Sequence, residues 1–148
     1  MHLCILCDTS GSLREGGKRF ALLTTLRTIE QCFWVRDASP EVSLFAVNDE
    51  PLSADWPDFR YLVDEPKGSF ALKKALSLPA VLSADKLLIL SDCCWNNDQR
   101  RAFRSLKLKR GSDFARAVVI GAEADKQCCA PDFATVENTL ALLEEWCP

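Results

Sequence analysis

Five oxygen-bearing side chains stand where predicted strands end or where a predicted helix begins. They are Asp8, Ser10, Ser12, Ser69 and Asp92. The first three form an Asp-x-Ser-x-Ser motif directly after the apolar run of residues 3–7, and the last follows the apolar run of residues 87–91. The remaining serine is predicted to open a helix. Side chains in such places converge at the carboxyl edge of open α/β sheets, so the five can bind one hard divalent cation.

The spacing of the motif suits Mg²⁺ or Mn²⁺, because alternate residues of a tight loop can turn their side chains toward one point. Asp8 supplies charge, while Ser10 and Ser12 supply neutral oxygen ligands. The motif alone is also typical of a strand followed by a helix-capping turn. The placement of Ser69 and Asp92 after it favours the metal site, which leaves coordination positions open for an outside ligand.

Length and composition indicate one globular domain spanning residues 1–148, since 48% of the residues are hydrophobic. The formal net charge of −3 points to neither a nucleic-acid nor a membrane partner. The first apolar run has no basic region before it and is short, which is wrong for a signal peptide or a membrane span. We therefore expect a cytoplasmic protein whose eight cysteines are mostly reduced and buried.

Strand-like and helix-like segments alternate along the chain. Apolar runs predict strands at residues 3–7, 42–47, 61–63, 87–90, 117–120 and 132–135. Helical periodicity predicts helices at residues 18–35, 69–78, 96–109 and 136–146, and residues 49–58 are expected to form an acidic loop. We therefore expect an α/β fold with a Rossmann-like, doubly wound and mostly parallel sheet. One antiparallel edge strand should come from residues 42–63, and helices should cover both faces.

With these residues in place, the chain resembles the von Willebrand factor A (VWA) domain family over nearly its whole length, in its compact intracellular bacterial form. The metal-ion-dependent adhesion site (MIDAS) of that family combines Asp-x-Ser-x-Ser, a threonine in a Gly-x-Thr-like turn, and a later aspartate after an apolar strand. The resemblance implies Ser10, Ser12 and Ser69 as direct ligands of Mg²⁺ or Mn²⁺. It implies that Asp8 and Asp92 often act through water.

The resemblance further implies a protein partner whose Asp or Glu fills the open metal position. A MoxR-type AAA+ ATPase, or another protein of the same gene cluster, is the partner that the family suggests. The chain departs from the family pattern at two positions. Ser69 replaces the usual threonine and lacks the methyl group that limits its rotamers. Cys93 stands where a glycine often follows the last aspartate, and neither change removes an oxygen ligand.

A Mg²⁺-dependent phosphoester hydrolase on a similar sheet is the alternative class. Such enzymes carry Asp-x-Asp after the first strand, and Ser10 stands here in place of the second aspartate, so a general acid/base carboxylate is missing. The only histidine, His2, lies at the opposite end of the first strand from Asp8. We therefore expect no catalytic activity, and a metal-free scaffold protein is the third interpretation.

The cysteines raise two further possibilities, a zinc site and redox control. Cys4-x-x-Cys7 resembles a zinc spacing, but residues three apart on a strand point to opposite faces. Oxidation of Cys7, Cys93 or Cys94 beside the metal loops is a hypothesis for redox control.

The predicted helix at residues 96–109 is rich in Arg and Lys, which indicates a solvated face and a basic rim for an acidic partner rather than a nucleic-acid site.

Overall fold

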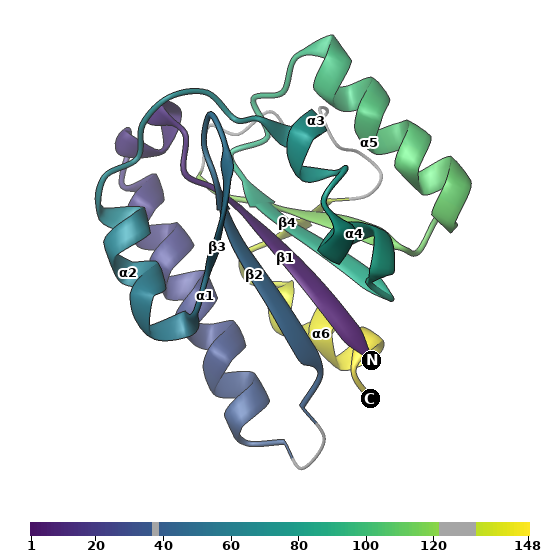
Figure 1. Cartoon of the computed structure of the whole chain (residues 1–148). Coiled ribbons are helices and arrows are strands. Elements are labelled where there is room, and N and C mark those ends of the chain that lie inside the picture. Colours follow the sequence, from purple (N-terminus) through teal and green to yellow (C-terminus); the bar gives the residue numbers. More distant parts are fainter. Residues whose placement is uncertain (37–38, 122–132) are drawn as a thin grey trace.

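The computed structural model describes residues 1–36, 39–121 and 133–148, and within these ranges six strands form one sheet in the order β3-β2-β1-β4-β5-β6 (Figure 1). The strands are β1 (His2–Asp8), β2 (Glu41–Val47), β3 (Pro51–Ala54), β4 (Lys86–Ser91), β5 (Ala115–Val119) and β6 (Phe133–Thr135). Among these strands β3 alone runs antiparallel to its neighbour. The predicted sheet type is confirmed. Residue 132, where the last strand was predicted to start, lies outside the described ranges.

The central strand is β1, which pairs in parallel with β2 on one side and with β4 on the other. Its residues 3–8 are all buried, because helices cover both faces of the sheet. The chain winds from β1 outward to β2 and β3, then returns to β4 and winds outward in the other direction. Asp8 and Ser91, the last residues of β1 and β4, therefore stand at the crevice where the winding reverses, which is where open α/β sheets bind ligands.

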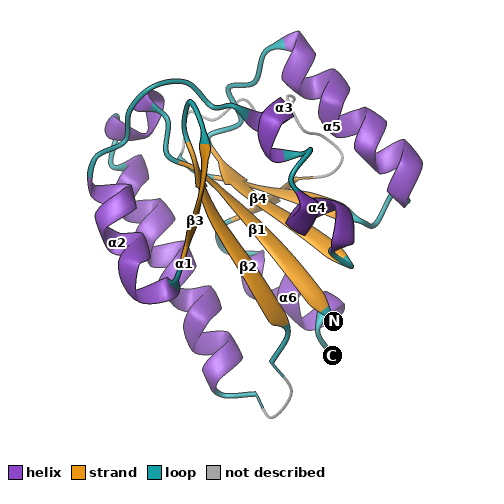
Figure 2. Ribbon diagram, in the orientation of Figure 1, coloured by secondary structure: helices purple, strands orange, loops and turns teal. Residues whose placement is uncertain are grey.

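The helices form two layers (Figure 2). On one face lie α1 (Lys18–Trp34), α2 (Trp56–Asp64) and α6 (Thr139–Trp146), and on the other lie α3 (Leu72–Ala75), α4 (Pro79–Ser83) and α5 (Asn97–Arg110). A short 3-10 helix, η1 (Gly11–Arg14), joins β1 to α1. Alternate residues of β1 enter two separate apolar cores, with Cys4 on one side and Cys7 on the other. The doubly wound α/β prediction is confirmed, and the two cysteines face opposite sides of the sheet.

The edge of the sheet differs from the prediction. Residues 61–63, predicted as a strand, belong to α2, and the antiparallel edge strand is β3, which falls in the predicted acidic loop. Pro57 lies in the first turn of α2, where a proline is well tolerated, and Phe59 and Val63 are buried one helical turn apart. Pro51 is acceptable in β3 because an edge strand needs fewer backbone donors.

The predicted helix at residues 69–78 is also wrong at its start. α3 begins at Leu72, and Ser69 lies in the loop before it. Pro79, which was expected only to end a helix, lies in the first turn of α4, where its missing N–H removes no helical hydrogen bond. Ser69 therefore lies in a loop and not at a helix terminus.

α5 is fixed at both ends by side-chain and backbone signals in its own sequence. Asn96 Oδ1 accepts from the backbone N–H of Gln99 at 2.9 Å, while Gln99 Oε1 accepts from the N–H of Asn96 at 2.8 Å. Gly111, with φ 105°, ends the helix. The capping box anchors the chain immediately after the loop that follows Asp92.

Candidate metal centre

Asp8, Ser10 and Ser12 form one hydrogen-bonded group at the carboxyl end of β1. Asp8 Oδ1 accepts from both the backbone N–H and the hydroxyl of Ser10, at 2.9 and 2.5 Å. The hydroxyl oxygens of Ser10 and Ser12 are 3.2 Å apart. The alternating residues of this loop do turn their side chains toward one point, as the motif predicts.

The second oxygen of Asp8 is held by Ser91, a residue that the sequence reasoning missed. The Ser91 hydroxyl donates to Asp8 Oδ2 at 2.7 Å, and its oxygen accepts from Trp95 Nε1 at 3.1 Å and from the Cys93 N–H at 3.1 Å. Ser91 is fully buried. A buried serine directly before the second strand-end aspartate was the available signal, because a buried hydroxyl in a strand needs a partner.

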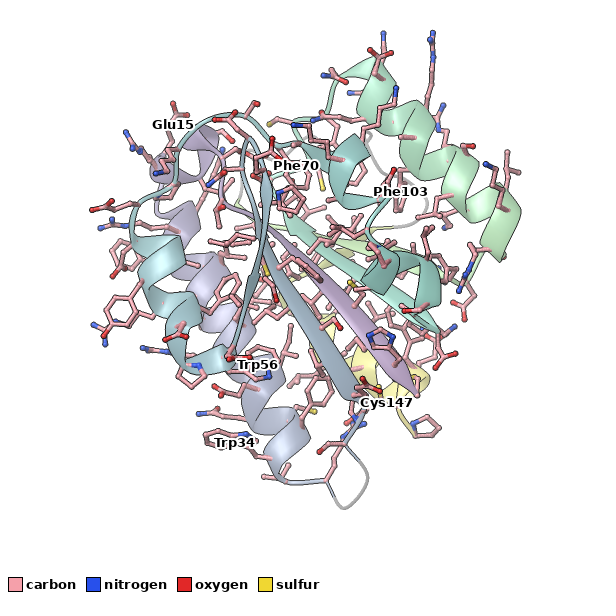
Figure 3. The ribbon with its side chains drawn as sticks, in the orientation of Figure 1. Glu15, Trp34, Trp56, Phe70, Phe103 and Cys147 are labelled. Carbon is pink, nitrogen blue, oxygen red and sulfur yellow. The ribbon has the colours of Figure 1, made fainter. Side chains whose placement is uncertain are left out.

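Trp95 fixes this part of the site from the core. Its ring lies 5.3 Å from Phe103 and 6.4 Å from Phe70, between centroids, and the two phenylalanines are labelled in Figure 3. Trp95 is 4% exposed. Its packing therefore locates Ser91, and through it the orientation of the Asp8 carboxylate.

Asp92 is 2% exposed and has two partners on different elements. Oδ1 accepts from the backbone N–H of Cys94 at 3.2 Å, and Oδ2 accepts from the ammonium of Lys18, the first residue of α1, at 3.2 Å. Cys93, which lies between Asp92 and Cys94, has φ 58°. It is the one non-glycine residue of the described ranges with a positive φ. The turn needs the left-handed conformation that glycine adopts most easily, which gives a physical reason for the glycine that the family often has there.

Ser69 is brought beside the Asp8 loop by the backbone, while its side chain is engaged elsewhere. Gly11 N–H donates to the Gly68 carbonyl at 2.9 Å, which joins the two loops. The N–H and the hydroxyl of Ser69 both donate to Asp49 Oδ1, at 2.9 and 2.8 Å. A Cβ on Gly68, whose φ is 70°, would lie 2.3 Å from Asp49 Oδ2, so the close approach needs glycine.

Asp49 is thus a second residue that the sequence reasoning missed, since it was assigned to the acidic loop. It is exposed, and the backbone and hydroxyl donors of Ser69 hold the pKa of its carboxyl below the usual range. Donation of the Ser69 hydroxyl proton to Asp49 fixes the rotamer and leaves the oxygen lone pairs free. This bond restores part of the orientation that a threonine methyl would provide.

The electrostatics of the centre are those of buried acids. Burial raises the pKa of Asp8 to about 6, hydrogen bonds from Ser10 and Ser91 oppose that rise, and the charge of Asp92 adds to it. Burial alone would lower the pKa of Lys18, but the hydrogen bond and charge of Asp92 raise it overall. Two neighbouring buried carboxylates and one ammonium are an arrangement that added positive charge would stabilise.

The donor set fits a hard cation, because every candidate ligand is a carboxylate or hydroxyl oxygen. The described residues contain no cluster of three or more His, Cys, Asp or Glu side chains arranged for a metal, so the serine hydroxyls would complete the set. Thr9 Oγ1 is buried and has no hydrogen-bond partner in the described part of the chain. His2, at the start of β1, pairs with Ser43 and is remote from Asp8.

The cysteines near the site differ in exposure. Cys7 is fully buried, and burial raises its pKa well above the usual range, so this thiol stays protonated. Cys93 is buried, but Cys94 is exposed, contrary to the expectation of buried thiols. Cys128 and Cys129, which were also expected to be reduced, lie outside the described residues.

Comparison with known proteins finds relatives by structure and not by sequence. No protein-family model and no curated protein matches the chain. Manganese-loaded TRAP protein of Plasmodium vivax superposes with a TM-score of 0.72 at 14% identity, over 99% of this chain and 72% of that one. Proximal thread matrix protein 1 of the mussel byssus, with a zinc-occupied MIDAS motif, gives 0.57 at 12% identity, over 97% of this chain and 44% of that one.

A third solved structure is the von Willebrand factor type A protein from Catenulispora acidiphila. Its TM-score is 0.54 at 15% identity, and the match covers 98% of this chain and 40% of that chain. The chain therefore spans less than half the length of the second and third of these neighbours. At such low identities the comparisons establish the fold alone.

Proposed function

We propose that this chain, which has the von Willebrand factor A fold, binds a divalent cation. The bound cation then captures an acidic side chain of a partner protein. The observation that carries the proposal is the hydrogen-bonded group of Asp8, Ser10 and Ser12 at the crevice of the sheet. Neighbours of the same fold that hold manganese, or zinc on a MIDAS motif, support it.

Each residue of the proposed site has a distinct role. Ser10, Ser12 and Ser69 would offer hydroxyl oxygens to Mg²⁺ or Mn²⁺, and Asp8 and Asp92 would supply negative charge, directly or through water. A bound divalent cation supplies a positive charge with open coordination positions, which a carboxylate from outside the chain can fill. The chain's own part is to hold these oxygens in place.

The surface beside the site supports an acidic partner. α5 begins just after the loop that follows Asp92, and the Arg101 and Arg104 side chains on this helix are exposed. A basic rim increases the rate at which an acidic protein associates. A MoxR-type AAA+ ATPase or another protein of the same gene cluster, met in the cytoplasm, is the partner that we propose.

A Mg²⁺-dependent pull-down tests the partner proposal. The partner should be retained with Mg²⁺, and it should be lost when chelator is added and in Asp8→Ala.

In the described residues no helix is both long and apolar enough to cross a membrane.

We also propose that the domain has no catalytic activity of its own. His2 is remote from the site, and no second aspartate follows Asp8 at the spacing of phosphoester hydrolases. Phosphatase turnover that disappears in Asp8→Ala would contradict this proposal and support the hydrolase class.

Isothermal titration of chelator-treated protein with Mg²⁺ and Mn²⁺ tests the metal site. Saturable binding that is lost in Asp8→Ala and Ser10→Ala is the expected result. Asp85→Ala and Ser77→Ala are matched controls, since both residues are exposed and lie away from the crevice. Absence of binding, even with a saturating acidic peptide present to complete the coordination, would favour a metal-free scaffold.

A further inference from the structure

Lys18 is a buried lysine at the entrance of α1, and its ammonium lies at the proposed metal centre. The residue is 8% exposed, although lysines are almost never buried without a partner. Its Nζ lies 3.2 Å from Asp92 Oδ2. A Cβ on Gly121 would come within 3.0 Å of Lys18 Cγ, so the glycine after β5 leaves the space that the lysine stem occupies. The Lys18 side chain is therefore packed against the fold and does not extend over the surface.

The pair gives Asp92 a cation in the absence of metal. A buried carboxylate is costly unless an opposite charge accompanies it, and here the chain itself supplies that charge. A divalent ion held by Asp92 would bring a second positive charge close to the same ammonium. The two cations would repel each other in a poorly solvated crevice, so they compete for one carboxylate.

We propose that Lys18 is a built-in competitor of the metal, which holds Asp92 in the metal-free protein, lowers the affinity for Mg²⁺ and Mn²⁺, and releases Asp92 when the metal binds. This inference rests on the proposed function. Glu15 is an exposed acid whose charge already acts on Lys18, and its carbonyl accepts from the Lys18 N–H at 3.1 Å. Glu15 lies at the same end of the molecule as Phe70 (Figure 3). Its carboxylate is the acceptor that the proposal assigns to the released ammonium, because its charge already acts on Lys18.

Metal titration of Lys18→Met is the direct test. Methionine keeps an unbranched stem for the space beside Gly121 while removing the charge. We expect Mg²⁺ and Mn²⁺ to bind at least about tenfold more tightly than in the unaltered chain, because a repelling charge is gone. Lys86→Met is the control, since Lys86 pairs with Asp113 at the start of β4, the opposite end of the sheet. If Lys18 only supported the fold, the Lys18→Met substitution would weaken metal binding.

The outcomes separate the inference from the proposed function. Metal binding by the unaltered chain with no gain in Lys18→Met overturns the inference and leaves the proposed function standing. Binding by Lys18→Met alone supports the inference, and means that the unaltered chain is held metal-free. Binding by neither protein, with the saturating acidic peptide present, overturns both.

A second measurement uses the unaltered chain and remains valid if Lys18→Met fails to fold. Acetylation of lysines by an N-hydroxysuccinimide ester is followed by mass spectrometry, with chelator and with saturating Mg²⁺. We expect Mg²⁺ to increase the labelling of Lys18 several-fold and to leave Lys86 unchanged. Equal labelling of Lys18 in both conditions overturns the inference.

Discussion

Replacement of Asp8 by asparagine should remove the pH dependence that this carboxyl gives to stability and abolish the response to metal. The pKa of this carboxyl is about 6 in the folded chain against an ordinary value of 3.8, and burial is the main cause. One pKa unit corresponds to about 1.4 kcal/mol, so burying the ionised carboxylate costs about 3 kcal/mol of unfolding free energy at pH 7.5. Asparagine avoids this cost and keeps an oxygen that accepts from Ser10. Its amide nitrogen cannot accept from Ser91, and that loss is the same at every pH.

The sign of the pH dependence follows from the same values. Because the folded pKa lies above the unfolded one, the folded state binds more protons between pH 3.8 and about 6. The contribution of Asp8 to stability therefore falls as the pH rises through this window, and is constant above it. The Asp8→Asn protein lacks this pH dependence, so its unfolding free energy relative to that of the unaltered chain should be about 2–3 kcal/mol higher at pH 7.5 than at pH 4.

Urea unfolding in chelator at pH 7.5 and pH 4 measures both effects. Asp113→Asn is the matched control, because the hydrogen bond from Lys86 lowers the pKa of Asp113. Asp113 stabilises the fold above its ordinary pKa and loses that effect in acid, so this variant should be less stable at pH 7.5. An Asp8→Asn protein whose unfolding free energy, relative to that of the unaltered chain, is the same at both pH values or is lower at pH 7.5 than at pH 4 would refute the reasoning.

Three further substitutions test the contacts around the site. Ser91→Ala removes the donor to Asp8 Oδ2 from a buried position, so urea unfolding should show a loss of about 2–4 kcal/mol. Asp49→Ala should weaken Mg²⁺ binding about tenfold in calorimetry, since Ser69 loses its orienting partner, and should change stability by less than about 0.5 kcal/mol because Asp49 is exposed. Gly68→Ala should lower stability by about 1 kcal/mol in urea unfolding, and Mg²⁺ affinity with it, because its φ is 70° and its Cβ would meet Asp49. Unchanged affinity in both loop variants would exclude Ser69 from the metal site.

The sequence was sufficient for the fold where local signals and tertiary packing agree. The run at residues 3–7 is apolar because β1 is covered on both faces. α1 carries helical periodicity, and α5 carries periodicity together with a capping box and a terminal glycine. It failed at the sheet edge and around Ser69. The strand β3 has four residues and little burial, so its pairing with β2 and not its own pattern makes it a strand.

The grouping of the side chains in the Asp8 loop was predictable from the sequence, and the side chains that support this loop were not. Asp8, Ser10 and Ser12 are read from one short motif, because their mutual position depends on a single loop. Ser91, Asp49 and Lys18 act through side chains that meet only after the sheet has formed, at separations of 83, 20 and 74 residues from their partners. Spacing along a chain carries no information about such pairs.

The hydrogen-bond chain from Trp95 through Ser91 to Asp8 has an optical consequence. Nε1 of the indole and the carboxylate share one hydroxyl group, so a change in the charge at Asp8 acts on the ring through two hydrogen bonds. Trp34, by contrast, is 76% exposed at the end of α1 and points away from the sheet (Figure 3). A quencher in solution reaches that exposed indole, whereas Trp95 and Trp146 are both buried. The emission that survives quenching therefore includes that of Trp95, and this part of it reports events at the carboxylate without any attached dye.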